Sequence, residues 1–209
     1  MKYLIITILF LFSLKVSLGQ TKFKVKAENM TGTWKKRYSL IDEKGKTIRK
    51  LDTSKYKLFL YENSYKYFTV IGIKGMTGFQ AIDENEKILF DVYNVSKHEI
   101  SPDVLRENKI RIKSNNGKIG FANHKGKVII EPQFERVTSF HNGKAIISKS
   151  CEEKQLDQEK PHGIKCHHTI IKCLEHGYID ENGKVLKLGT YTFDEIKKEI
   201  GWEPRKFQF

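Results

Sequence analysis

The 209-residue sequence has little of several features that commonly reveal a function. It has three cysteines, four prolines and one long apolar run, which lies at its N-terminus. A single run excludes a polytopic membrane protein. There is no C-x-x-C pair, as a standard zinc finger would need, and the glycine-rich segment 72–78 lacks the Lys-Ser/Thr ending of a phosphate loop. No catalytic pair stands out, so we expect neither an enzyme nor a bound cofactor.

The apolar run at the N-terminus has the layout of a secretory signal peptide. Lys2 supplies the positive start, residues 4–14 form the apolar core, and Ser17 and Gly19 precede a cut before Gln20. The run is too short to span a bilayer, and no cysteine at the cut supports a lipid anchor. We therefore expect residues 1–19 to be removed and the protein to be exported to the periplasm or exterior of a bacterial cell, with no transmembrane segment after cleavage.

The charge balance indicates which partners fit an exported chain. Lysine and arginine number 38 against 25 acids, a net charge of +13. Cleavage removes two lysines and no acid, which leaves 36 − 25 = +11. An anionic envelope glycan, a lipid surface or an acidic protein is the expected partner, and nucleic acid is not. The lysines are scattered along the chain, which is also typical of a generally solvated surface.

A repeat with a period of about forty residues runs through the sequence. Similar segments at 40–46, 81–87, 122–127 and 178–184 each lead an apolar run into a polar turn. Glycine at such a turn permits the positive φ that a tight hairpin requires. Glu86 replaces that glycine in the second segment, so there we expect another turn type or a strained turn. The acids at the start of three turns should bond their own backbone; they are Asp42, Asp83 and Asp180.

Alternation of apolar and polar residues predicts half-buried strands between the turns, for example at 57–61, 66–70 and 109–113. Residues 193–200 instead carry apolar side chains at i, i+3 and i+7, which predicts a helix. The sequence therefore predicts an all-β protein, an array of about four antiparallel β-hairpin repeats, open or propeller-like, with a short C-terminal helix.

The third unit resembles the WG repeat family of bacterial proteins, also called KWG repeats. The resemblance rests on residues 120–123, 126–130, Pro132, 134–137, Phe140, Gly143 and 145–147. It extends more weakly over repeat-like units at about 38–76, 77–117, 118–149 and 176–200, within a single domain at 20–209. The tryptophan that precedes glycine in the family is absent, and Thr77, Ile119 and His176 are assigned to its place. The resemblance implies a β-rich array that mediates interactions, with no shared catalytic residues.

Residues 150–175 depart from the repeat and hold all three cysteines. Export favours a disulfide among Cys151, Cys166 and Cys173. Cys166 and Cys173 could lie on paired strands, or Cys151 could join Cys173 and close a long loop at its base. A zinc or copper site is the second interpretation; its ligands would come from His162, Cys166, His167, Cys173 and His176. The third is a thiol nucleophile with a histidine base.

These observations favour an exported, non-catalytic binding protein of the bacterial cell envelope. A lysine closes each repeated turn and would form a row of positive charge if the units stack in register; the four are Lys46, Lys87, Lys127 and Lys184. The alternative is a metal-binding or thiol-dependent protein that uses residues 150–175.

Overall fold

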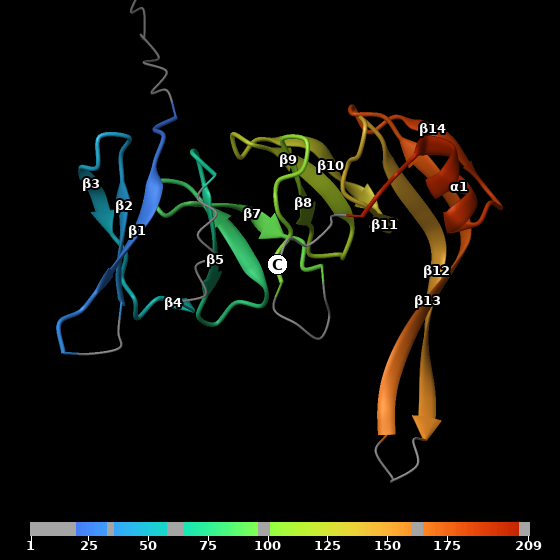
Figure 1. Cartoon of the computed structure of the whole chain (residues 1–209), viewed down its shortest axis with the longest axis horizontal. Coiled ribbons are helices and arrows are strands. Elements are labelled where there is room, and N and C mark those ends of the chain that lie inside the picture. Colours follow the sequence, from blue (N-terminus) through green and yellow to red (C-terminus); the bar gives the residue numbers. More distant parts are fainter. Residues whose placement is uncertain (1–19, 33–35, 58–64, 96–100, 160–164, 205–209) are drawn as a thin grey trace, which may run out of the picture.

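The computed structural model describes residues 20–32, 36–57, 65–95, 101–159 and 165–204, and the side chains of these residues except 155–159 and 165–169. Residues 1–19, the expected signal peptide, lie outside this part. The described residues form antiparallel sheets and one short helix, so the all-β prediction is confirmed (Figure 1). No helix in the described part of the chain has the length and apolarity needed to cross a membrane.

Three sheets follow one another along the chain. The first sheet has the order β1-β2-β3, with β1 (Lys24–Asn29), β2 (Lys36–Ile41) and β3 (Thr47–Lys50). The central sheet runs in order from β10 to β4, with β4 (Tyr56–Lys57), β5 (Thr69–Ile73), β6 (Phe79–Ile82), β7 (Ile88–Val92), β8 (Lys109–Lys113), β9 (Ile119–Asn123) and β10 (Val128–Phe134). The last sheet has the order β11-β12-β13-β14, with β11 (Arg136–Val137), β12 (Ala145–Glu159), β13 (Lys165–Ile179) and β14 (Val185–Gly189).

The strand expected at 66–70 begins later than its alternation predicts. Tyr65 and Phe68 form an isolated bridge around a turn in which Lys66 has φ 30°, and β5 starts at Thr69. All five residues of β5 are buried, so this strand packs on both faces and does not need an alternating pattern. The strand expected at 109–113 coincides with β8.

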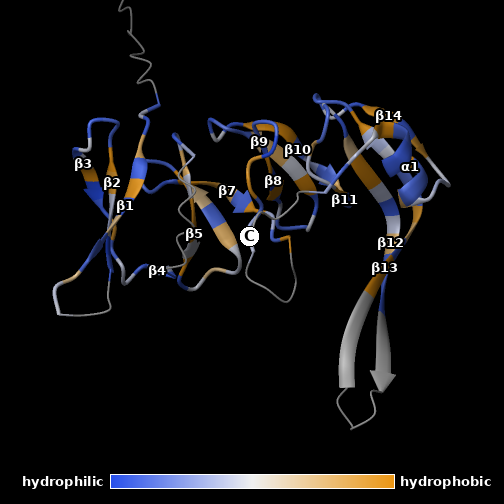
Figure 2. Ribbon diagram, viewed as in Figure 1, coloured by the Kyte–Doolittle hydropathy of each residue, from blue (hydrophilic) through white to orange (hydrophobic). Residues whose placement is uncertain are grey.

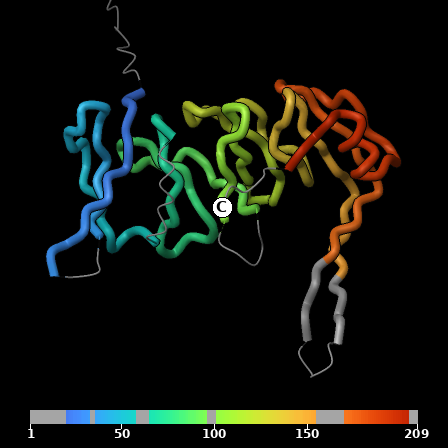
Figure 3. Tube along the Cα trace, viewed as in Figure 1, coloured from blue at the N-terminus to red at the C-terminus, as the bar shows by residue number. Residues whose placement is uncertain are grey.

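The sheets stack because alternate residues of one strand enter different cores. Ile71 and Ile73 of β5 join Leu40 of the first sheet in a first core, whereas Val70 of the same strand joins Ile110 of β8 in a second. In a third core, Phe121 of β9 packs with residues of the last sheet. The chain thus advances along the long axis of the molecule, one layer after another (Figure 3), and apolar residues line the strands of these layers (Figure 2).

Helix α1 (Phe193–Ile200) covers the outer face of the last sheet. It matches the predicted helix, and its apolar spacing has the expected effect, since Ile196 and Ile200 are buried against Ile146 of β12. Thr192 caps its first turn in a reciprocal box with Glu195, and Gly201 ends it with φ 61°. The helix therefore covers the face of the last sheet opposite to Ala145 and Ile147.

The residues before each repeated turn correct one assignment. Counting back four residues from Asp42, Asp83, Asn123 and Asp180 gives Tyr38, Phe79, Ile119 and His176. The strand pairings agree, because Ile82 pairs with Ile88 one residue before the turn as Ala122 pairs with Val128. The structure therefore aligns Phe79, and not Thr77 as the sequence suggested, with Ile119; Thr77 precedes β6.

The glycine of the family pattern has a steric reason. A Cβ at Gly177 would lie 1.8 Å from the carbonyl oxygen of Lys187, and one at Gly120 would lie 2.4 Å from that of Ile130. The neighbouring strand, β14 beside Gly177 and β10 beside Gly120, therefore passes too close for a side chain at these two positions. The corresponding residues elsewhere are Ser39 and Gln80, both buried.

Candidate functional site

The repeated turns share one set of hydrogen bonds. In each, the side-chain oxygen of the Asp or Asn accepts the backbone N–H two and four residues later; the second bond comes from Lys46 (2.8 Å), Lys87 (2.9 Å), Lys127 (3.0 Å) and Lys184 (2.9 Å). The bond from the N–H two residues later is donated by Lys44, Asn85, Lys125 and Asn182. The prediction that these acids bond their own backbone is confirmed. All four closing lysines are exposed, so each turn holds a lysine backbone fixed and leaves its ammonium in water.

Each later turn lies against the layer that precedes it. A Cβ at Gly126 would come within 2.8 Å of Leu89 in β7, and one at Gly183 within 2.8 Å of Ile130 in β10. At the junction with the first sheet, the carboxylate of Glu86 in the turn after β6 forms an ion pair with Arg49 in β3. Lys87, Lys127 and Lys184, which close these three turns, are therefore placed at successive junctions of the stack, whereas a Cβ at Gly45 in the first turn would have nothing within 4 Å.

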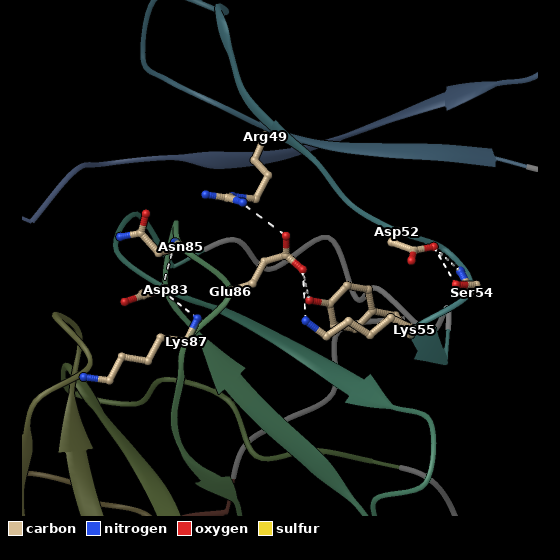
Figure 4. A network of polar contacts seen from close by, with 9 residues as sticks. Arg49, Asp52, Ser54, Lys55, Asp83, Asn85, Glu86 and Lys87 are labelled. Carbon is tan, nitrogen blue, oxygen red and sulfur yellow. Dashed lines mark hydrogen bonds and ion pairs between the residues drawn. The ribbon is translucent and has the colours of Figure 1, made fainter.

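The turn at Glu86 matches the second of its two expected forms, a strained turn, and not another turn type. The turn keeps the hydrogen bonds of its counterparts, and Glu86 takes φ 62° where the others have glycine. Its carboxylate accepts hydrogen bonds from the Tyr56 hydroxyl and from Lys55 Nζ at 3.4 Å, and Arg49 Nε lies 3.8 Å away (Figure 4). Burial, followed by the hydrogen bond to Glu86, raises the pKa of Tyr56 above its ordinary value. Glu86, with its backbone in the left-handed conformation, thus links the turn after β6 to the first sheet and to β4 through its carboxylate.

The described parts of this segment, residues 150–159 and 165–175, form strands. They are the outer parts of β12 and β13, a long two-stranded ribbon that projects from the stack (Figure 1). Cys151 and Cys173 face each other in the register and form a disulfide. The idea that Cys166 and Cys173 lie on paired strands is wrong, since both belong to β13. Cys166 pairs in register with Gln158 on β12.

The ligands expected for a metal site are only partly described. His162 and the side chains of Cys166 and His167 lie outside the described residues. Cys173 is in the disulfide and so offers no thiolate in this state. His176 Nδ1 lies 2.8 Å from Ser148 Oγ, its ring packs edge-on against Phe193, and burial lowers its pKa. No cluster of three or more possible ligands occurs among the residues that the structure describes.

Two hollows beside the last sheet are features that sequence reasoning missed. They have volumes of about 650 Å³ and 700 Å³ and share Tyr93 and Arg136 in their walls. The larger also includes Arg111, whose guanidinium bonds both oxygens of the buried Asp103 and lies 4.6 Å from the ring of Tyr93. No sequence pattern connects Tyr93 with Arg136, because the stacking of the sheets brings them together.

Comparison with known proteins supports the resemblance in one unit. The family described as "WG containing repeat" matches residues 119–150, which contain β9, β10, β11 and the first part of β12. No curated protein and no solved structure gave a significant match. The match includes Gly120, whose close approach to β10 accounts for the family glycine, and the turn from Asn123 to Lys127. The resemblance that the sequence predicted for the third unit is therefore confirmed as a match over residues 119–150.

Proposed function

We propose that this protein is an exported, non-catalytic binding protein of the bacterial cell envelope. In this proposal its four repeated turns mark four WG-type units of one open array, of which residues 119–150 are the unit that matches the family. The N-terminal run would direct export and be removed before Gln20. The protein would then act in the periplasm or outside the cell, where anionic glycans and lipids are abundant.

The observation that carries the proposal is the shared geometry of the closing lysines. The four have the same backbone hydrogen bonds and are all exposed. Packed sheets are about 10 Å apart, which is close to the screening length of about 8 Å at physiological salt. Neighbouring lysines in such a row would act together on one extended polyanion, more strongly than the same charges scattered over the surface.

The test replaces Lys46, Lys87, Lys127 and Lys184 together by glutamate. A matched variant replaces Lys36, Lys50, Lys74 and Lys149, which are also exposed but do not close these turns. Binding to heparin and to phosphatidylcholine vesicles with and without phosphatidylglycerol is measured at two salt concentrations. Each surface lysine contributes about 1 kcal/mol toward an anionic membrane, so the turn variant should lose at least about a hundredfold in affinity.

The matched variant has the same net charge as the turn variant, but its substituted lysines do not close the turns. It should therefore lose clearly less affinity. Equal losses in the two variants would mean that total charge and not the row governs binding. The alternative function, a metal or thiol site in residues 150–175, predicts about one zinc or copper per chain in purified protein. It has less support, because the site would need Cys173 as a thiolate and Cys173 is in a disulfide.

A further inference from the structure

The ribbon formed by β12 and β13 extends well beyond its neighbours in the last sheet. β11 pairs with β12 only at Ser148 and Ile147, and β14 pairs with β13 only from His176 to Ile179. Beyond these positions no third strand flanks the ribbon in the described part of the chain. An isolated two-stranded ribbon is marginally stable in water, and its outer edges carry unpaired backbone groups.

The two edges of the ribbon differ. On β12, the amides of Ser150 and Cys151 donate to the two carboxylate oxygens of Glu135, at 3.0 and 2.8 Å. Charged side chains follow at once, and Glu153 pairs with Arg136 at 2.8 Å. This edge is therefore occupied and charged, as natural proteins protect edges against pairing.

The edge of β13 has the opposite character. Ile170 and Ile171 are each 40% exposed, and Leu174 is 73% exposed. Lys172 is the exposed charge among them. Large apolar side chains at this exposure on an uncovered strand are what an added strand would bury.

The backbone groups that face this edge can be identified. The amide of Cys151 bonds Glu135, so it points away from β13. The Cα atoms of Cys151 and Cys173 lie 3.9 Å apart, which is typical of the close pairs that exchange no ladder hydrogen bonds. The N–H and C=O of Cys173 therefore point to the open edge. The same holds for Ile171, because outward and inward residues alternate along a strand.

A hollow of about 700 Å³ adjoins this edge, and its walls include Leu174, Tyr191 and Phe193. Tyr191 follows the end of β14, so a strand added beside β13 would continue along the line of β14. Alternate side chains of that strand would reach the hollow, which can take apolar groups. Backbone pairing and pockets for alternate side chains are together the requirements of β-strand addition.

We propose that the outer edge of β13 around Ile171 and Cys173 binds an extended strand of a partner protein that carries apolar residues and a carboxylate opposite Lys172. Charge selects this occupant over a second copy of the chain. Two exported copies would each bring a net charge of 36 − 25 = +11, and antiparallel pairing about Lys172 would place two lysines opposite each other. The site is separate from the lysines of the repeated turns, so its failure would leave the polyanion proposal standing.

The test uses the full exported chain and a nine-residue peptide that alternates valine and threonine around a central glutamate. A peptide with lysine at the centre is the comparison. The glutamate peptide should bind about tenfold more tightly, because attraction replaces repulsion at Lys172. Lys172→Glu should reverse this preference. In hydrogen exchange, the amides of Ile171 and Cys173 should become protected when the peptide is added.

Ile171→Pro removes the outward N–H and should abolish peptide binding, whereas Ile171→Val keeps the N–H and should retain it. Formation of the Cys151–Cys173 disulfide in both variants shows that the ribbon is intact. If Ile171→Pro does not form the disulfide, the Lys172→Glu result decides. Equal binding by both variants, equal binding of the two peptides, or a wild-type dimer that Ile171→Pro converts to a monomer would overturn the proposal.

Discussion

Replacing Glu86 by glycine tests whether tertiary contacts outweigh local backbone strain. The repeat itself suggests that glycine should stabilise this turn, because the three counterpart turns have it and Glu86 sits at φ 62°. Relief of a left-handed conformation is worth about 1 kcal/mol. On the other side, glycine removes the carboxylate that accepts the Tyr56 hydroxyl.

The gain from relieved backbone strain and the cost of the lost carboxylate contacts can be compared from the structure. Tyr56 is 1% exposed, so its hydroxyl would lose a charge-assisted hydrogen bond in a buried place, a cost of about 1.5–3 kcal/mol. Lys55 and Arg49 are about half exposed, and each adds at most about 1 kcal/mol. Subtracting about 1 kcal/mol for the relieved strain leaves an expected loss of about 0.5–4 kcal/mol in the free energy of unfolding for Glu86→Gly.

Urea unfolding followed by circular dichroism measures this loss. Gly45→Ala is the matched control, because Gly45 has φ +83° in the same kind of turn with nothing within 4 Å of an added Cβ. It isolates the backbone strain and should cost about 1 kcal/mol. A double-mutant cycle with Tyr56→Phe should give a coupling of about 1–2 kcal/mol. If Glu86→Gly instead stabilises the protein by the amount that Gly45→Ala costs, the contacts of Glu86 contribute nothing and the reasoning fails.

Three further predictions concern the last sheet. Alkylation of the unfolded protein without reductant should label one cysteine, Cys166, and labelling after reduction should reach three; three labels without reductant would contradict the disulfide. Reduction should speed amide exchange in residues 149–159 and 165–175 and leave the stack unaffected, because these parts of the ribbon lie outside the cores. Burial lowers the pKa of His176 from 6.5, so unfolded chains bind its proton first and stability falls as the pH drops below about 6.5. His176→Gln should flatten that part of the pH profile of the urea midpoint, and an unchanged profile would exclude the contribution.

Local chemistry was enough to predict the turns and the helix. An Asp or Asn at the start of a tight turn can accept hydrogen bonds from the backbone that follows it. The four turns could therefore be found without a structure, even the second, which has Glu86 in place of glycine. The helix was equally local, because its apolar spacing and its cap lie within ten residues. The resemblance of residues 119–150 to a WG repeat was recognisable because their glycines and apolar residues lie close together in the sequence.

The stacking of the layers determined the other features, namely the turn at Glu86, the disulfide pairing and the open edge of β13. A glutamate could replace a turn glycine because Tyr56, thirty residues earlier, bonds its carboxylate. The polar segment after Ser150 became strand because it continues a pairing that starts in the third core, and the register of that pairing, not the spacing of the cysteines, selected Cys151 and Cys173. The open edge of β13 likewise depends on where β14 stops. These features depend on residues that are distant in the sequence, so only the tertiary structure could decide them.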